Sequence, residues 1–357
     1  MEKKSVCILF GGVSPEHEVS LRSAESVLNN LNKDRYDIWP VGITKSGAWF
    51  LYGDTDWSRL PGGAWQGCPQ NRRAAISPVR GQGLLIFEGD TVRTVRLDAV
   101  FPVLHGENGE DGSVQGLLKL AGIPWVGPGV AASATCMDKC LTKLVCDRAG
   151  IRQAAWELVT REDLAEDETG ALDRVEARFA YPVFVKPAGT GSSVGVSKAR
   201  DRKALSAAFR EAVKFDRKVL VEEFISGQEV ETAVLGNRAP EVSVCGEIDS
   251  GAEFYDYDAK YRSDCSRLYI PARISDAAAQ TVRETALRVY LACGCKGLSR
   301  VDFFVTEKEE VVFNEINTLP GFTSISMYPK LFAASGIPYG ELLDRLIDLA
   351  VEAGWDA

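Results

Sequence analysis

Histidine is scarce in this sequence, and cysteine lacks the spacing that disulfide and metal frameworks need. Only two histidines, His17 and His105, occur in 357 residues, which excludes a His-rich metal site. The nine cysteines are odd in number and include no C-x₂-C pair, so disulfide scaffolds and zinc ribbons are disfavoured. We expect the thiols to be reduced and buried.

Excess positive charge and long apolar runs are also lacking. The formal net charge is −9, whereas proteins that bind nucleic acid usually carry a basic face, so we expect no nucleic-acid partner. No apolar run is long enough to span a membrane, and the short charged start leads directly into an apolar segment. We therefore expect a cytoplasmic protein without a membrane partner. The length allows two or three domains.

The order of the expected elements predicts an α/β protein. An apolar run at residues 5–10 precedes two glycines and a helix-like segment that begins near Ser14 and Pro15, which is the opening unit of a parallel α/β sheet. Further strands are expected in DIWPVGI and DAVFPVLHG, whereas residues 53–75 show no periodicity and should be irregular. We assign residues 1–130 to this N-terminal domain.

The rest of the chain is expected to form a central domain at residues 131–230 and a C-terminal domain of α+β character at residues 231–357. The segment AASATCMDKCLTKLVCDRAG predicts one helix that ends at Gly150. A final helix is expected in PYGELLDRLIDLAVEAG. Residues 249–267 are rich in aromatic and charged residues, so we expect a lid there, with an ordinary surface loop as the alternative.

Two strand-like segments near the C-terminus, LSRVDFFV and VVFNEIN, flank a short charged stretch and predict a hairpin. The expected antiparallel register puts three pairs on one face: Arg300 opposite Asn317, Asp302 opposite Glu315, and Phe304 opposite Phe313. Two facing carboxylates repel each other, so a cation should lie between them. Oxygen ligands with an amide carbonyl suit Mg²⁺ or Mn²⁺ rather than zinc. A solvent-exposed face with scattered charges is the alternative.

Two glycine-containing stretches favour contacts with an anion and a sugar. VKPAGTGSSVG places Ser192 and Ser193 among small glycines behind Lys186, which suits an anion, although a plain hairpin is the alternative. In VEEFISGQE, Glu222 and Glu229 are able to accept hydrogen bonds from ribose hydroxyls. Ordinary surface acids are the alternative at these two positions.

Two polar residues follow predicted strands, where ligands bind in α/β sheets. His105 in FPVLHGENGEDGSVQG is a candidate polar contact or proton carrier, with a structural histidine as the alternative. Glu16 lies at the first strand–helix turn and is a candidate partner for an ammonium group. Its alternative role is that of a first-turn acid favoured by the helix dipole.

Taken together and in this order, these motifs resemble those of the D-alanine–D-alanine ligase family of ATP-grasp enzymes. The resemblance covers nearly the whole chain and rests on FGGVSPEHEVS, LHGENGEDGSVQG, MDK, VKPAGTGSSVG, VEEFISGQE, FYDYDAKY, SRVDFF and NEINTLPGFTSISMYP. It implies an N-terminal parallel α/β domain followed by a two-part ATP-grasp fold. It also implies a cytoplasmic homodimer that makes D-alanyl-D-alanine for peptidoglycan from D-alanine and ATP through an acyl phosphate.

The resemblance implies a role for each matching position. ATP contacts are implied at Lys139, Lys186, Ser193, Glu222, Phe224, Ile225 and Glu229. Two Mg²⁺ or Mn²⁺ ions are implied at Asp302, Glu315 and Asn317. The first D-alanine is implied to bind Glu16, which is linked to Ser192 and Tyr261, and the reaction's oxyanion is implied to meet Arg300 and the N–H of Gly321. Further substrate contacts are implied at His105, Lys260, Ser326 and Met327.

Two departures from the family pattern and three alternatives remain open. Ile325 and Glu223 differ from residues found in several relatives, so contacts to the second amino acid and to adenine are expected to differ. Parts of the chain also resemble the vancomycin-resistance ligases that join D-alanine to D-serine. Another ATP-grasp carboxylate–amine ligase and a non-catalytic nucleotide-binding regulator are the remaining alternatives.

Overall fold

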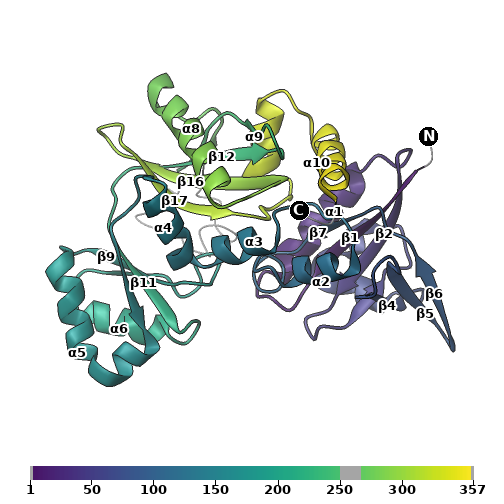
Figure 1. Ribbon diagram of the computed structural model, residues 1–357, viewed down its shortest axis with the longest axis horizontal. Coiled ribbons are helices and arrows are strands. Elements are labelled where there is room, and N and C mark those ends of the chain that lie inside the picture. Colours follow the sequence, from purple (N-terminus) through teal and green to yellow (C-terminus); the bar gives the residue numbers. More distant parts are fainter. Residues whose placement is uncertain (1–2, 250–266, 355–357) are drawn as a thin grey trace.

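The computed structural model describes residues 3–249 and 267–354, and three β-sheets carry its architecture (Figure 1). The predicted lid at residues 249–267, with Lys260 and Tyr261, lies outside these ranges apart from its two end residues. None of the helices within them is long and apolar enough to cross a membrane. The α/β class predicted from the sequence is confirmed, and the domain boundaries stay predictions.

The first sheet combines a parallel centre with an antiparallel extension. Its strand order is β6-β5-β4-β3-β2-β1-β7, in which β2, β1 and β7 are parallel and the other neighbours are antiparallel. The strands are β1 (Lys4–Gly11), β2 (Tyr36–Ile43), β3 (Trp49–Leu51), β4 (Arg72–Ile76), β5 (Leu84–Glu88), β6 (Thr91–Val95) and β7 (Ala99–Val103). The segment expected to be irregular, residues 53–75, holds two short 3₁₀ helices, Trp57–Arg59 and Pro61–Gly67, and the start of β4.

Helices cover both faces of this sheet, which explains why β1 is almost continuously apolar. Alternate side chains of a strand point to opposite faces. Val6, Ile8 and Phe10 pack in one cluster with helix α1 (His17–Asn30), whereas Cys7 and Leu9 pack in another with helix α2 (Ser113–Ala121). Since β1 ends at Gly11, the turn that carries Glu16 lies at the carboxyl edge of the parallel strands.

The C-terminal helix α10 (Tyr339–Ala353) packs against the first sheet's helix rather than only against its chain neighbours. Leu342, Leu343, Leu346 and Ile347 belong to the same buried cluster as Val6 of β1 and Leu28 of α1. The cluster continues through helix α9 (Met327–Ala334) to strand residues of the third sheet. The first and last parts of the chain therefore share one hydrophobic core, and Figure 1 shows α10 beside α1.

The second sheet is small and antiparallel, with the order β10-β9-β11-β8. Its strands are β8 (Trp156–Thr160), β9 (Val183–Pro187), β10 (Ser197–Ala199) and β11 (Lys218–Glu223). Helices α5 (Arg161–Arg178) and α6 (Arg202–Ala212) bury one face through a shared apolar cluster. The other face meets Cys140 through Ala188 and Leu220, and thereby faces the helix that carries Lys139.

The helix predicted up to Gly150 is two helices, so that prediction was wrong. Helix α3 (Val130–Met137) stops at Asp138, and α4 (Lys139–Arg148) begins directly after it. Asp138 has extended backbone angles, and its carboxylate accepts hydrogen bonds from the N–H groups of Cys140 (3.0 Å) and Leu141 (3.2 Å). An aspartate at this position caps a new helix instead of continuing the old one. The break places Lys139 at the first turn of α4.

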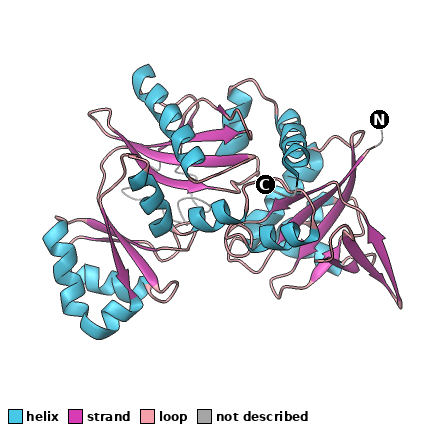
Figure 2. Ribbon diagram, in the orientation of Figure 1, coloured by secondary structure: helices cyan, strands magenta, loops and turns pink. Residues whose placement is uncertain are grey.

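The third sheet is antiparallel and forms the floor of the site. Its path is β15-β14-β12-β16-β17, with β13 also paired to β12. Its strands are β12 (Gln228–Leu235), β13 (Glu241–Val242), β14 (Gly246–Asp249), β15 (Arg267–Tyr269), β16 (Leu298–Val305) and β17 (Val311–Asn317). Helix α8 (Asp276–Ala292) covers the face turned away from the site, and Figure 2 shows the separation of helices and strands into layers.

The predicted hairpin is present, but its register shifts at one point. Asp302 pairs with Glu315 and Arg300 pairs with Asn317, as predicted. The third predicted pair was wrong, because Phe313 lies opposite Phe303 and Phe304 lies opposite Val312. A β-bulge after Asp302 leaves Asn314 as an extra residue. The bulge turns Phe313 into the core against Phe303 and leaves Asn314 beside the site.

Candidate active site

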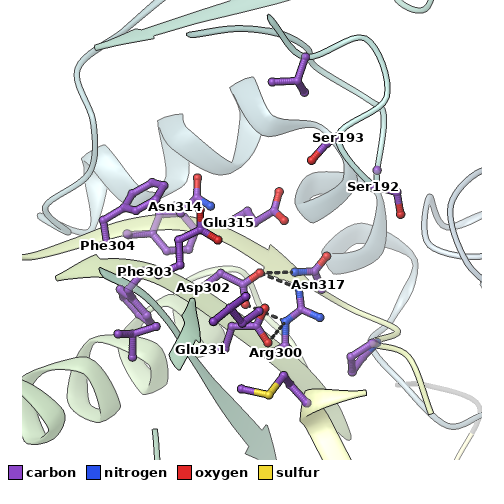
Figure 3. Close-up of a pocket in the computed structure, with 18 of the residues that line it drawn as sticks. Ser192, Ser193, Glu231, Arg300, Asp302, Phe303, Phe304, Asn314, Glu315 and Asn317 are labelled. Carbon is purple, nitrogen blue, oxygen red and sulfur yellow. Dashed lines mark hydrogen bonds and ion pairs between the residues drawn. The ribbon is translucent and has the colours of Figure 1, made fainter. Parts of the chain in front are cut away.

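A cavity of about 930 Å³ is lined by strand residues of the second and third sheets and by Glu16, Val19, His105 and Glu110, which follow strands β1 and β7 of the first sheet. Every predicted site residue within the described ranges lines this cavity. The set comprises Glu16, His105, Lys139, Lys186, Ser192, Ser193, Glu222, Phe224, Ile225, Glu229, Arg300, Asp302, Glu315, Asn317, Gly321, Ser326 and Met327. Figure 3 shows Asp302, Glu315 and Arg300 projecting from the hairpin, with Ser192 and Ser193 on the loop across from them. The roles of these residues stay predictions.

A buried carboxylate between two lysines marks one end of the cavity. The Oε1 atom of Glu222 lies 2.5 Å from the Nζ of Lys143, and its Oε2 atom lies 2.6 Å from the Nζ of Lys186. Burial alone would raise the pKa of Glu222, but the charges of Lys143 and Lys186 outweigh it and lower that pKa to about 2. Burial lowers and Glu222 raises the pKa of Lys186, with a net upward shift. Glu222 and Lys186 are therefore both charged at neutral pH.

The glycine-rich loop is tied to the start of α4. The ammonium of Lys139 donates a hydrogen bond of 2.6 Å to the carbonyl of Thr190, and its backbone N–H donates to Ala188. Asp216 accepts the N–H of Gly189 at 2.7 Å. Ser192 and Ser193 both have positive φ angles, 49° and 58°, which are uncommon for residues other than glycine. The loop is thus held in a turned backbone conformation above the hairpin.

The hairpin face carries a network of one cation and two carboxylates. The guanidinium of Arg300 donates to both oxygens of Asp302, at 2.8 and 2.7 Å, and its Nε lies 3.0 Å from Glu231. The amide of Asn317 donates to Asp302 at 3.0 Å. Burial lowers the pKa of Arg300, but Asp302 and Glu231 raise it more, so that it stays well above its usual value. Arg300 is a permanent positive charge.

The oxygen donors on this face fit a divalent metal ion of the Mg²⁺ or Mn²⁺ type. Asp302 and Glu315 are directly opposed across the ladder, and Glu315 also lies 4.0 Å from the Nζ of Lys139. Among residues 3–249 and 267–354, no group of three or more His, Cys, Asp or Glu side chains has a metal-binding arrangement. Asp302, Glu315 and the amide oxygen of Asn317 are the candidate donors on this face. Such a set, with oxygen atoms alone, suits hard cations.

Glu16 and Ser192 meet across the cavity, although 176 positions separate them in the chain. The hydroxyl of Ser192 donates to Oε1 of Glu16, and Glu16 directly precedes helix α1. A β-carbon added at Gly106 would lie 2.7 Å from Oε2 of Glu16, and one at Gly191 would lie 3.0 Å from the same atom. A side chain at either position would therefore push the Glu16 carboxylate away from this place.

The loop after β17 places the residues predicted for the oxyanion and the second amino acid. The Ser326 hydroxyl accepts the N–H of Thr323 at 3.0 Å, and a β-carbon on Gly321 would lie 2.7 Å from that hydroxyl. Met327 is buried, and its terminal methyl would lie 2.3 Å from a β-carbon on Gly246. Met327 therefore fills the space beside β14 and presents an apolar wall to the cavity.

Four residues near the site were not singled out from the sequence. Lys143 follows Lys139 by four positions and hence lies on the same face of the helix. This spacing could have identified Lys143 from the sequence. Asn314 reaches the site only through the bulge, where it accepts a hydrogen bond of 3.4 Å from Lys186. Glu231 contacts Arg300 from the neighbouring strand β12. The alternation of polar and apolar residues along β12 could have identified it from the sequence. The fourth residue, Glu110, lies within a stretch quoted for its resemblance, but nothing marked this acid apart from its neighbours.

Glu110 is an acid of the site whose pKa is strongly shifted. Its Oε2 accepts the N–H of Gly106 at 2.7 Å, and its Oε1 accepts the N–H of Leu319 at 3.2 Å. Burial first, and the charge of Glu16 second, raise the pKa of Glu110 to about 8 against the effect of these two bonds. A cation bound beside Glu16 would relieve this repulsion.

Comparison with known proteins gives one consistent result. The family model described as D-ala D-ala ligase N-terminus matches residues 5–128, and that described as D-ala D-ala ligase C-terminus matches residues 145–348. The D-alanine–D-alanine ligase of Acetivibrio thermocellus is 49% identical, with 98% of this chain and 96% of that protein covered. That of Clostridium novyi is 48% identical, with 98% of each covered.

Solved structures give the same picture. The VanG D-Ala:D-Ser ligase from Enterococcus faecalis matches with a TM-score of 0.89 and 41% identity, covering 98% of this chain and 100% of that one. The D-alanine–D-alanine ligase from Coxiella burnetii matches with a TM-score of 0.84 and 34% identity, covering 99% and 95%.

Proposed function

The chain belongs to the D-alanine–D-alanine ligase family, and on this premise we propose that it uses ATP to join two D-alanines into D-alanyl-D-alanine for peptidoglycan. The observation that carries the proposal is the convergence of Glu16, the glycine-rich loop and the Arg300 hairpin on one cavity. A carboxylate for an ammonium group, a cradle for phosphates and a cation for an oxyanion are the groups that this reaction requires.

The first step activates a carboxylate that is by itself a poor acyl donor. A carboxylate oxygen of the first D-alanine attacks the γ-phosphorus of ATP, the bond to the bridging oxygen breaks, and ADP leaves. Glu16 holds the ammonium group of this D-alanine, and Ser192 fixes Glu16. Lys139 and Lys186 contact the phosphates, while Glu222 orients Lys186. Ser193, Phe224, Ile225 and Glu229 supply the remaining nucleotide contacts.

We assign two divalent ions to the oxygen atoms of Asp302, Glu315 and Asn317. When bound, such ions supply neutralisation of the charge on the transferring phosphoryl group. The protein's own part is to hold both carboxylates on one sheet face, where the guanidinium of Arg300 donates to both oxygens of Asp302. The ammonium of Lys139 lies 4.0 Å from Glu315.

The second step forms the amide. The amine of the second D-alanine attacks the acyl carbon, and the tetrahedral oxyanion collapses with loss of inorganic phosphate. Arg300 and the N–H of Gly321 are the proposed donors to this oxyanion, since preorganised donors lower the barrier where charge develops. His105, Lys260, Tyr261 and Ser326 are the proposed further contacts to the two amino acids.

We propose D-alanine as the preferred second substrate. Met327 is buried and apolar, so this position gives a serine hydroxyl no charged partner. An apolar pocket rejects an added hydroxyl by only about a hundredfold, so slow use of D-serine is expected. The similarity to the VanG D-Ala:D-Ser ligase makes the D-serine reaction the second candidate.

One competition experiment decides between these substrates. The enzyme is given ATP, Mg²⁺ and equal concentrations of D-alanine and D-serine at neutral pH, and the dipeptides are counted by mass. A majority of D-alanyl-D-alanine supports the proposal, and a majority of D-alanyl-D-serine refutes it. Phosphate release with other D- and L-amino acids in place of these two tests the other ATP-grasp ligases, and no release with any amino acid would favour a regulator.

A cytoplasmic homodimer is the remaining proposal, and it rests on the family resemblance alone. Light scattering on the purified chain measures its mass in solution. A mass of one chain at micromolar concentration would refute the dimer.

A further inference from the structure

The short loop at residues 319–322 carries Gly321 and has its backbone held from outside. Leu319 precedes the glycine, and both of its backbone groups are bound by side chains: its N–H by Glu110 at 3.2 Å and its carbonyl by Nδ1 of His105 at 3.0 Å. Phe322 follows the glycine and is bound in the same way. Its N–H donates to the hydroxyl of Ser23 at 3.2 Å, and its carbonyl accepts the hydroxyl of Tyr339 at 2.7 Å.

These four side chains come from parts of the chain far from the loop. Ser23 lies on α1, and Tyr339 is the first residue of α10. His105 and Glu110 lie in the segment after β7. The backbone groups on both sides of Gly321 bond to side chains instead of to a neighbouring strand. These hydrogen bonds fix the irregular loop in position.

The direction of the bonds is also determined. A carbonyl oxygen only accepts, so Nδ1 of His105 carries a proton toward Leu319. In the neutral ring the Nε2 atom then accepts the hydroxyl of Ser23, which lies 3.2 Å away. Ser23 in turn accepts the N–H of Phe322. These hydrogen bonds thus form a continuous chain from Phe322 through Ser23 and His105 to Leu319, and they connect the two sides of Gly321.

Glu110 connects this hydrogen-bonded network to the segment beside the proposed site of the first amino acid. Its second oxygen accepts the N–H of Gly106 at 2.7 Å, and Gly106 packs against Glu16. One carboxylate therefore joins the backbone next to Glu16 and the backbone next to Gly321. Two loops that must lie at a fixed distance during acyl transfer are connected through it.

We propose that Glu110, together with His105, Ser23 and Tyr339, is a positioning group that aims the N–H of Gly321 at the developing oxyanion. The inference rests on the function proposed above. It assigns Glu110 and Tyr339 no contact with the reacting atoms, and Tyr339 does not line the cavity. Because a displacement of about 1 Å is enough to cost roughly a hundredfold in rate, loosening this loop should lower turnover without weakening ATP binding.

The first test replaces Glu110 by glutamine, with Glu107→Gln as its control. Glutamine keeps the size of the side chain but turns one acceptor into a donor that faces a backbone N–H. We expect kcat to fall about 10- to 100-fold, with the KM for ATP unchanged within about twofold. Glu107 lies three residues earlier, is exposed, and does not line the cavity, so Glu107→Gln should keep wild-type kinetics.

A second readout separates positioning from a general loss of structure. A phosphinate analogue of the dipeptide imitates the tetrahedral intermediate, and its inhibition constant should rise in proportion to the fall in kcat/KM. D-Alanine binding should change much less. Equal weakening of D-alanine, ATP and the phosphinate would overturn the proposal, and so would a kcat within twofold of wild type.

The third test acts from outside the cavity and remains decisive even if Glu110→Gln fails to fold. Tyr339→Phe removes only the hydroxyl that binds Phe322, and we expect kcat to fall about 3- to 10-fold. Tyr52→Phe is the matched control, because Tyr52, in the segment after β3, also donates its hydroxyl to a backbone carbonyl, that of Asp56, at 3.0 Å. Equal kinetics of the two tyrosine variants would refute the proposal. A wild-type chain that makes no dipeptide would instead refute the function on which it rests.

Discussion

Replacing Glu222 by glutamine should strongly lower the stability of the folded protein. The Glu222 side chain is 5% exposed and that of Lys143 is 2% exposed, while Lys186 is 16% exposed. Without the carboxylate, two ammonium groups face each other in a region that water hardly reaches. At least one of them must then lose its proton or force the surrounding structure to open.

Two separate routes give the size of the effect. A pKa lowered from its ordinary value near 4.5 to about 2 corresponds to about 3 kcal/mol of stability, at about 1.4 kcal/mol per pH unit. Breaking a buried ion pair by removing one partner costs about 3–5 kcal/mol in general. Both routes place the loss near 3 kcal/mol at pH 7.

Urea unfolding of the wild type, Glu222→Gln and Glu166→Gln measures this loss. Glu166 is exposed on α5, so its variant should stay within about 0.5 kcal/mol of the wild type. The pKa of Glu222 is lower in the folded state, so its stabilisation is complete above about pH 4.5 and disappears as the pH falls toward 2. A Glu222→Gln loss below about 1 kcal/mol at pH 7 would refute the reasoning.

Three other changes give distinct outcomes. Glu315→Gln removes one charge from the proposed metal site and should lower turnover at least about tenfold, with a higher Mg²⁺ requirement; normal metal dependence would contradict the assignment. The folded-state pKa of Glu110 is raised to about 8, so its presence costs stability as the pH rises from about 4.5 to 8, and the stability of Glu110→Gln relative to wild type should increase by about 1–2 kcal/mol between pH 6 and 8 in urea titrations. Gly246→Ala places a methyl group against Met327 and should raise the KM for the second amino acid more than that for ATP in steady-state kinetics.

The sequence was sufficient for those features that depend on local pattern. The alternation in LSRVDFFV and VVFNEIN predicted the hairpin and two of its three pairs, because period-2 burial fixes which residues share a face. It could not reveal the bulge, since one extra residue in an apolar strand changes neither composition nor turn signals. For the same reason the position of Asn314 became visible only in the structure.

Features that depend on distant contacts were not available from local pattern. The break at Asp138 interrupts a segment whose apolar spacing continues on both sides, so the capping bonds to Cys140 and Leu141 decide it. Glu110 looks like any other acid in a charged loop until Leu319, more than 200 positions later, donates to it. The grouping of Glu16 with Ser192 came from the family resemblance, because nothing in the two segments themselves implies that they meet.

The shared core of α1 and α10 has a consequence for how the protein is made. All strands of the first sheet have been synthesised by residue 103, yet Leu342, Leu343 and Leu346, which pack with α1, are synthesised some 240 residues later. The nascent chain therefore carries an open apolar face through most of its translation, which favours capture by a chaperone. Tyr339 arrives with the same helix, so the loop around Gly321 is secured only when the protein is almost complete.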